Sequence, residues 1–455
     1  MPRSLFDTAP AAPFPPLWQD DAPRPEGRSG DELRRLKAQL HQQLILNLDL
    51  NALGAMPPEQ VRLEIRRVAD ELCQRSPNLL SRSEREQLVK EVLDEAFGLG
   101  PLEPLLQDPS ITDILINGPH TVYVERQGRL EKVDTNFSDG RHLLNILQRV
   151  VGQAGRRVDE TSPMVDSRLP DGSRVNAIIP PLALDGALVS IRRFGAKPID
   201  MEDLIAKKAL PVDMADFLAA CVRARLNVLI SGGTGSGKTT LLNALSAFIP
   251  SDERLITIED AAELRLQQPH VGRLETRPNN IEGVGEVSTR DLVRNAMRMR
   301  PDRIVIGECR GPEALDMLQA MNTGHEGSLT TIHANDTRDA LSRLEIMVGM
   351  AGFDLPIWVI RRQIASAIHL VVQVSRLLGG ARKVVKVSEV TGMEGDNITM
   401  HDIFTFKQTG LDQERRAQGY FLTTGIRPCC LERLEALGVP LPADMFERRM
   451  LNAGR

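Results

Sequence analysis

The residues best suited to chemistry lie in one glycine-rich segment. Gly232-Gly-Thr-Gly-Ser-Gly-Lys-Thr239 fits G-x-x-x-x-G-K-[ST], the spacing of a loop that binds nucleotide phosphates. Its glycines let several backbone N–H groups point at the phosphates, and the predicted helix after it adds partial positive charge. We expect Lys238 to contact the β- and γ-phosphates and the Thr239 hydroxyl to bind Mg²⁺. The residues predicted to contact ATP and Mg²⁺ here are Gly233, Thr234, Gly235, Ser236, Gly237, Lys238, Thr239 and Thr240.

Two predicted strands end in carboxylates. Glu308 follows the apolar run 303–307, so we expect it at the sheet edge that faces the loop, polarising water or holding Mg²⁺ through water. Many such ATPases carry an aspartate just before this glutamate, but Gly307 stands there, which weakens direct metal ligation. Glu259 and Asp260 end the second strand and could orient water and Mg²⁺. The alternatives are a salt-bridged or helix-capping Glu308 and a solvated acidic loop.

Histidines and arginines supply the remaining candidates. His325 and His333 flank the apolar run 329–332 and are candidate γ-phosphate sensors, although isolated histidines are often plain polar residues. No third ligand stands at zinc spacing. Phosphoryl transfer often takes an arginine from outside its own sheet, and the candidates are Arg174, Arg192 and Arg193 on preceding strands. Ser288 is predicted to open a helix that ends at Pro301. Three arginines spaced four residues apart would form a basic stripe on one face of it, which we interpret as solvated rather than as a subunit interface: Arg290, Arg294 and Arg298.

Pattern and composition divide the chain into four parts. Residues 1–30 are Pro-rich and predicted to be disordered, 31–98 are predicted to form a helical bundle, and 99–197 an α+β domain. Within 99–197 we expect a hairpin over 121–130, a strand pair at 174–179 and 187–191, and a helix around 143–150. Over 198–455, strands at 228–230, 255–258, 304–306 and 329–332 alternate with helices, which predicts an α/β fold with a parallel sheet.

The composition limits the possible function. The net charge of −5 gives no support to a nucleic-acid-binding surface, so we expect no direct nucleic-acid partner. No apolar run approaches the ~18 residues that span a bilayer, and the first residues lack a signal-peptide core, so we expect a cytoplasmic protein. The cysteines form no C-x-x-C pair, which argues against zinc and favours reduced thiols: Cys73, Cys221, Cys309, Cys429 and Cys430.

Long segments of the chain resemble the secretion-ATPase superfamily that powers type II and type IV secretion and type IV pili. Within it the chain is most similar to the CpaF/TadA-type ATPases of tight-adherence (Flp) pili. The absence of paired cysteines departs from the branch whose members carry a four-cysteine zinc element. The resemblance rests on Leu99-Gly-Pro-Leu-Glu-Pro-Leu-Leu, Asp113-Ile-Leu-Ile-Asn-Gly118, Val165-Asp-Ser-Arg-Leu-Pro-Asp-Gly-Ser-Arg-Val-Asn-Ala177, Ile191-Arg-Arg-Phe194, the segment 298–308 and the segment 320–335.

The resemblance implies a hexameric ring whose subunits each hold a small PAS-like N-terminal domain and a RecA-like ATPase domain. ATP would bind between these domains, with neighbouring subunits completing the site. Lys238 and Thr239 would then be the Walker A residues, and Glu308 the glutamate of an atypical Walker B motif. The other implied positions are Glu259 and Asp260 in the Asp box, His325 and His333 in the His box, and Arg192 and Arg193 as arginines that reach ATP.

The leading hypothesis is therefore a hexameric cytoplasmic ATPase motor that powers assembly of a tight-adherence pilus or a type II-like secretion system. Its partner would be an inner-membrane platform protein, which would hold the ring at the membrane. The same chemistry would serve a type IV secretion system that exports protein or DNA. A nucleotide-dependent scaffold without useful hydrolysis would predict a degraded Lys238 or Glu308, and both are present.

Overall fold

The computed structural model describes residues 98–451 except 127–128, 136, 194–198, 278 and 280–283, together with scattered positions between 60 and 95. The chain divides into two compact units, residues 1–107 and 108–455. The predicted tail over 1–30 lies outside the described residues, as does most of the predicted bundle over 31–98. The described positions between 60 and 95 are helical, and a turn of 3-10 helix, η1 (Gly100–Leu102), leads into α5 (Glu103–Gln107).

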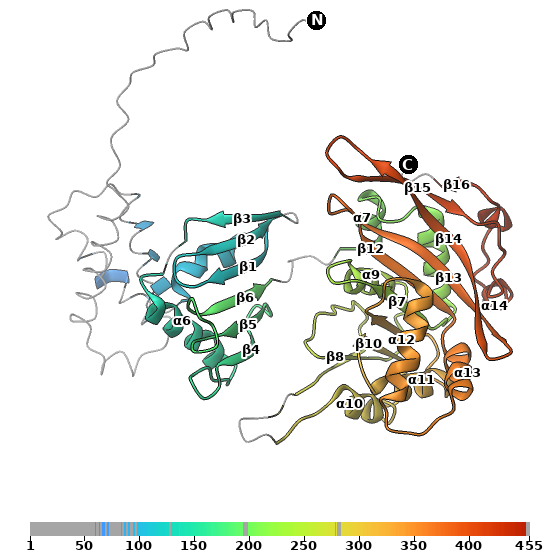
Figure 1. Ribbon diagram of the computed structural model, residues 1–455, viewed down its shortest axis with the longest axis horizontal. Coiled ribbons are helices and arrows are strands. Elements are labelled where there is room, and N and C mark those ends of the chain that lie inside the picture. Colours follow the sequence, from blue (N-terminus) through green and yellow to red (C-terminus); the bar gives the residue numbers. More distant parts are fainter. Residues whose placement is uncertain are drawn as a thin grey trace, which may run out of the picture. The chain divides into compact units, whose positions relative to one another are not determined.

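A small antiparallel sheet follows, with strand order β3-β2-β1-β6-β5-β4 (Figure 1). The predicted hairpin and strand pair are confirmed as β2–β3 and β5–β6. The predicted helix is α6, which buries its apolar face and is capped by the Asp139 carboxylate. The elements are β1 (Ile111–Asn117), β2 (Val122–Arg126), β3 (Arg129–Val133), α6 (Gly140–Gln153), β4 (Met164–Arg168), β5 (Arg174–Ile178) and β6 (Leu188–Arg192).

The large sheet has the strand order β16-β15-β14-β13-β12-β7-β11-β10-β8-β9. The strands from β12 to β9 are parallel, and the four predicted strands are confirmed as β7, β8, β10 and β11. The elements as far as β11 are α7 (Met201–Ala206), α8 (Val212–Arg223), β7 (Val228–Gly232), α9 (Lys238–Ser246), β8 (Leu255–Glu259), β9 (Val271–Glu275), α10 (Thr289–Ala296), β10 (Arg303–Cys309), α11 (Glu313–Asn322) and β11 (Leu329–Ile332).

The C-terminal part of the sheet differs from the predicted parallel arrangement. Strands β12 to β16 pair antiparallel. Residues 377–381, 395–396 and 412–416, which join β12 to β15, are turns too short for the crossover that parallel strands need, whereas β16 follows a longer segment that contains α14. The remaining elements are α12 (Thr337–Gly349), α13 (Ile357–Ala367), β12 (Leu370–Arg376), β13 (Arg382–Glu394), β14 (Asn397–Leu411), β15 (Ala417–Thr423), α14 (Leu431–Ala436), η2 (Ala443–Phe446) and β16 (Met450–Leu451).

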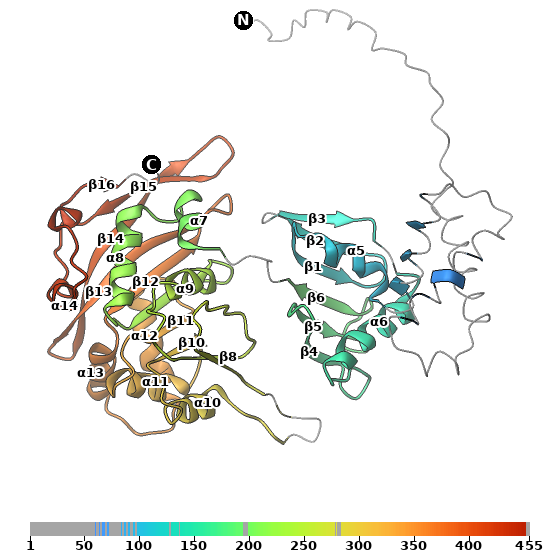
Figure 2. The ribbon, with the colours of Figure 1, turned by 180° about the vertical axis from the view of Figure 1, so that it is seen from behind.

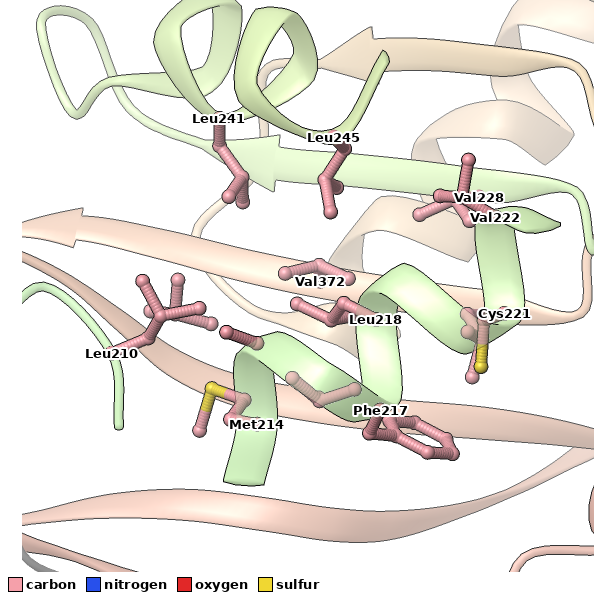
Figure 3. Packing of buried hydrophobic residues seen from close by; sticks show 14 of the residues in the cluster. Leu210, Met214, Phe217, Leu218, Cys221, Val222, Val228, Leu241, Leu245 and Val372 are labelled. Atoms are coloured by element: carbon pink, nitrogen blue, oxygen red, sulfur yellow. The ribbon is translucent and has the colours of Figure 1, made fainter. Parts of the chain in front are cut away.

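Helices cover both faces of the large sheet. Helices α11 to α13 pack on one face (Figure 1), and α8 lies on the other (Figure 2). Val228 of β7 faces the α8 side, where Phe217 and Leu245 also pack (Figure 3), whereas Leu229 belongs to the opposite core. Strands buried on both faces are mostly apolar, which explains why the sequence shows them as apolar runs rather than as an alternation of polar and apolar residues. None of the described helices is long and apolar enough to cross a membrane.

Two of the three arginines in the predicted solvated stripe contact a buried acid, whereas the third, Arg298, is exposed and lies beyond the end of α10. Arg290 Nε and Arg294 Nε each lie 2.8 Å from a carboxylate oxygen of Asp316 on α11, and the Asp316 side chain is only 7% exposed. Arg290 and Arg294 therefore tie α10 to α11. Ser288 caps the helix as predicted, but α10 ends at Ala296, short of the predicted end.

Candidate nucleotide site

The phosphate-loop segment connects β7 to α9 in a conformation that needs glycine. Gly235 and Gly237 have φ of +66° and +102°, which residues with side chains rarely adopt. A Cβ on Gly232 would collide with the carbonyl oxygen of Val374 on β12. Helix α9 begins at Lys238 with no side-chain cap, so its first N–H groups remain available for an anion.

Lys238 lies under this loop and is only 8% exposed. Its Nζ donates to the carbonyl oxygens of Gly232 at 3.0 Å and Gly233 at 3.2 Å. Burial lowers the pKa of Lys238, and the nearby Glu308 carboxylate partly opposes this. The ammonium group is also 3.2 Å from Nε2 of His333, so the structure brings together the predicted lysine and one predicted histidine.

Glu308 lies at the end of β10, between a histidine and an arginine. Its Oε1 is 2.8 Å from His333 Nε2, and its Oε2 accepts a hydrogen bond from Arg310 Nε at 2.9 Å. Arg310 also lies 3.4 Å from a carboxylate oxygen of Asp260. Burial lowers the pKa of His333, the Glu308 carboxylate opposes this shift, and the positive charges of Lys238 and Arg310 add to it. The same ring nitrogen of His333 therefore lies close to both the Lys238 ammonium and the Glu308 carboxylate.

Glu259, at the end of β8, is buried beside Gly307. Its Oε1 accepts hydrogen bonds from the N–H groups of Glu263 at 2.8 Å and Leu264 at 2.9 Å. Burial raises the pKa of Glu259. A Cβ on Gly307 would lie 2.8 Å from Glu259 Cγ. The residue before Glu308 is therefore a glycine because the Glu259 side chain fills the space that an aspartate would need.

The side chains present fit a magnesium ion. Thr239, Glu259 and Glu308 offer oxygen donors, which Mg²⁺ prefers, and Glu259 Oε2 is buried with no hydrogen-bond partner in the described part of the chain. Within the same described residues, no group of three His, Cys, Asp or Glu side chains could enclose a metal. Mg²⁺ commonly keeps several waters and shares its ligands with substrate phosphates, so this sparse set suits it.

Not every predicted residue lies at the loop. His325 precedes β11 and His333 follows it, so the two histidines lie at opposite ends of a strand about 13 Å long. His325 forms a turn there, with its carbonyl accepting from the Ser328 hydroxyl. The three predicted arginines each lie against an oxygen of the small sheet or of the segment just before it: Arg174 with Asp166, Arg192 with Asp113, and Arg193 with the carbonyls of Asp108 and Ile111.

Two arginines that the sequence analysis missed lie beside the predicted residues. Arg310 contacts Glu308, and its position two residues after that glutamate could have indicated it. Arg382, at the start of β13, donates from Nε to the Gly235 carbonyl at 2.9 Å. Nothing near Arg382 in the sequence marks it, because its place depends on how β13 pairs with β12.

Comparisons with known proteins identify the family of the chain. The family model described as "Type II/IV secretion system protein" matches residues 95–421. A Mycobacterium tuberculosis protein whose given name assigns it provisionally to conjugal transfer is 39% identical over 307 residues, which are 66% of this chain and 87% of that protein. The type IV secretion system protein VirB11 of Bartonella henselae is 31% identical over 318 residues, covering 62% of this chain and 89% of VirB11.

Among solved structures, the VirB11 ATPase of Brucella suis in complex with sulphate is 32% identical, covering 65% of this chain and 97% of that one, with a TM-score of 0.36. The family match spans most of the chain and includes the phosphate loop, Glu259, Glu308 and His333. This chain therefore belongs to the type II/IV secretion system protein family, and it is a nucleotide-binding ATP hydrolase of that family.

Proposed function

We propose that the chain is the cytoplasmic motor of a membrane-bound assembly, working as a homohexameric ring that hydrolyses ATP with Mg²⁺. The observation that carries the proposal is the position of Glu308. Its carboxylate is held by His333 and Arg310 beside Lys238, at the edge of the sheet where the phosphate loop begins. A carboxylate fixed next to the terminal phosphate can orient a water molecule and accept its proton.

The roles of the other residues follow from their contacts. Lys238 would exchange its bonds to loop carbonyls for bonds to the β- and γ-phosphates, and the first N–H groups of α9 would bind phosphate oxygens. His333 would contact the γ-phosphate, and Arg310 would hold Glu308 in place. When bound, Mg²⁺ supplies positive charge to the β- and γ-phosphates. Arg192 and Arg193 remain candidates for completing a site from outside the large sheet.

Substitution of Glu308 by glutamine tests the proposal, because it keeps the shape and removes the base. We expect Glu308→Gln to bind ATP as the wild type does and to hydrolyse it at least a hundredfold more slowly. Lys238→Ala should lose both nucleotide binding and hydrolysis. Glu432→Gln, an exposed glutamate on α14, is the control and should change neither property. Unchanged turnover in Glu308→Gln would remove Glu308 from the mechanism.

Two assemblies are candidates for the motor's task. The long motif matches favour a tight-adherence or type IV-like pilus, or a related type II-like secretion system. The names of two similar proteins, one a type IV secretion system protein and the other a protein assigned to conjugal transfer, favour a type IV secretion system. In either case the partner would be an inner-membrane protein of the complex, with the ring peripheral to that membrane and no direct contact with nucleic acid.

Expression of Glu308→Gln in the native host distinguishes the two assemblies. Variant subunits that bind ATP without hydrolysing it should poison mixed rings, so the wild-type function is lost even with the normal gene present. Loss of surface pili with normal export would support the pilus motor, and loss of exported protein or DNA with normal pili would support the secretion motor. ATPase activity that rises strongly with DNA, and does so less as salt increases, would contradict both.

A further inference from the structure

Two arginines flank the phosphate loop from the side opposite the acids. Arg376 ends β12 and Arg382 begins β13, and the two residues lie directly opposite each other in the antiparallel pair. Arg382 Nε donates to the Gly235 carbonyl at 2.9 Å, and its Cδ lies 3.5 Å from where a Cβ on Gly237 would be. Arg376 Nη1 lies 3.8 Å from the corresponding position on Gly235. Both guanidinium groups therefore border the rim of the loop.

The turn that joins these arginines is fixed to its neighbours. The N–H of Leu377 donates to Ala381 at 2.7 Å within the turn, and Leu378 accepts a bond from the N–H of Ala417 at 2.9 Å. Arg416 packs directly against Gly379, where any side chain would collide with it. A pocket at this point is lined by Arg376, Arg382, Arg416 and Glu414, among others. The two guanidinium groups therefore lie at the ends of a turn, residues 377–381, that is held in place by its neighbours.

Charge in this arrangement favours an anion. Like charges at directly opposed positions of an antiparallel pair repel each other and destabilise the pair. Here the pair stands beside a loop whose N–H groups and lysine already select phosphate. A phosphate oxygen beside the guanidinium groups would accept charge-assisted hydrogen bonds from them.

The strand order identifies which part of the nucleotide lies at the arginines. Strand β7, which leads into the loop, has β11 on one side and β12 on the other. His333 follows β11, and Glu308 ends the next strand, β10, so the γ-phosphate and its water belong on that side. Arg376 and Arg382 stand on the β12 side, away from the reacting end.

We propose that Arg376 and Arg382 form a subsite for the α-phosphate and ribose of the bound nucleotide. This inference rests on the nucleotide hydrolysis proposed above and adds which residues recognise the nucleoside end. The subsite acts on binding of ATP and ADP alike, because both carry the α-phosphate. It does not act on the cleavage step, because the bond that breaks lies on the other side of the loop.

Calorimetric binding of ATP, ADP and inorganic pyrophosphate to the full-length protein tests the subsite. In Arg376→Ala and Arg382→Ala we expect the Kd of ATP and of ADP to rise about tenfold or more, as loss of a charge-assisted hydrogen bond predicts. Pyrophosphate occupies only the loop, so its Kd should stay within about twofold of the wild type if the loop is intact. In steady-state assays KM should rise while kcat stays nearly constant. Arg382→Lys, which keeps the charge, should recover part of the affinity.

The controls separate this inference from the proposed function. Arg427→Ala removes an exposed arginine elsewhere and should bind all three probes normally. A loss confined to ATP would place the arginines at the γ-phosphate, and an equal loss for pyrophosphate would reduce them to supports of the loop; either result overturns the subsite. Suppose that the wild type binds nucleotide, that Lys238→Ala does not, and that both arginine variants bind normally. In that case only the proposed subsite fails, and the proposed function stands. If wild type binds no nucleotide, the proposed function fails too.

Discussion

Gly307 shows how a single missing side chain shapes the site. The Glu259 side chain packs against it, with two backbone N–H groups holding the carboxylate in place. The oxygen donors near the loop therefore come from the ends of two strands, β8 and β10, rather than from adjacent residues of one strand. At this scale the identity of residue 307 determines where the Glu259 carboxylate can stand.

Gly307→Ala tests this relationship. The new Cβ would approach Glu259 Cγ to about 2.8 Å, closer than packed carbon atoms tolerate, so the anchored glutamate must move. We expect ATP hydrolysis to fall at least tenfold while ADP binding to the loop is preserved. Steady-state ATPase assays and ADP titration measure the two effects. Gly349→Ala, where an added Cβ meets nothing within 4 Å, is the matched control. Normal ATP turnover in Gly307→Ala would show that hydrolysis does not depend on the position of the Glu259 side chain.

The sequence predicted those site residues whose signals lie next to each other along the chain. Lys238 was predicted because loop and helix follow each other directly, and Glu308 because an apolar strand ends in an acid. Arg382 could not be predicted, since it is more than a hundred residues from the loop in sequence and reaches Gly235 only through the pairing of β12 with β7 and β13. The roles assigned to these side chains, including Arg192 and Arg193, stay predictions.

Among the elements, α10 and α11 are joined through one buried carboxylate. Asp316 accepts hydrogen bonds from Arg290 and Arg294 one turn apart on α10, so the two helices share a charged contact as well as apolar packing. A sequence pattern cannot distinguish a basic stripe that faces water from one that faces a buried acid on another helix. For Arg290 and Arg294 the spacing therefore predicted a shared helix face correctly and its surroundings wrongly, while Arg298 is exposed as predicted.

Asp316→Ala should destabilise this contact. Removing the carboxylate leaves two guanidinium groups facing each other without the acid, and Arg290 is largely covered. We expect the free energy of unfolding to fall by about 2 kcal/mol or more, below the full loss for a buried pair because Arg294 is half exposed. Urea denaturation measures it. Arg298→Ala, the exposed third member of the stripe, should leave the unfolding free energy within about 0.5 kcal/mol of the wild type. Equal free energies of unfolding for Asp316→Ala and Arg298→Ala would contradict the contact between α10 and α11.

The strands divide into those that the sequence predicted and those that it did not. Strands β7, β8, β10 and β11 are buried on both faces, and their continuous apolar runs identified them. Strands β13 and β14 have one partly exposed face and mix polar with apolar residues, so their segments gave no comparable signal. Short turns then made this part of the sheet antiparallel, which the alternation of strands and helices earlier in the chain did not predict.

At the scale of the whole molecule, His369 links distant parts of the large domain. Its Nδ1 accepts a hydrogen bond from the N–H of Asn227 at 3.0 Å, and Arg433 of α14 lies 3.4 Å from its Nε2. Burial, together with the Arg433 charge, lowers the pKa of His369 to about 4. The folded protein therefore holds this histidine neutral where an unfolded chain would protonate it.

The lowered pKa predicts a pH-dependent stability. Between the unfolded value near 6.5 and the folded value of about 4, the unfolded chain binds the proton more readily. Stability is thus complete above pH 6.5 and is lost as the pH falls toward 4, by at most about 3 kcal/mol from this residue. In urea denaturation across this range His369→Asn should show a flatter profile than wild type. His401→Asn, at an exposed position, should follow the wild-type curve, and a parallel curve for His369→Asn would refute the assignment.

Strand β13 has a mechanical consequence for a motor. It begins with Arg382 at the phosphate loop and ends with Glu394 at the opposite edge of the sheet, about 40 Å away. Strand β12 pairs with its residues 382–389 and β14 with its residues 386–394, so the two ladders together hold the strand from one end to the other. A force on the turn between β13 and β14 and a change of charge at the phosphate loop therefore act on opposite ends of the same paired strand.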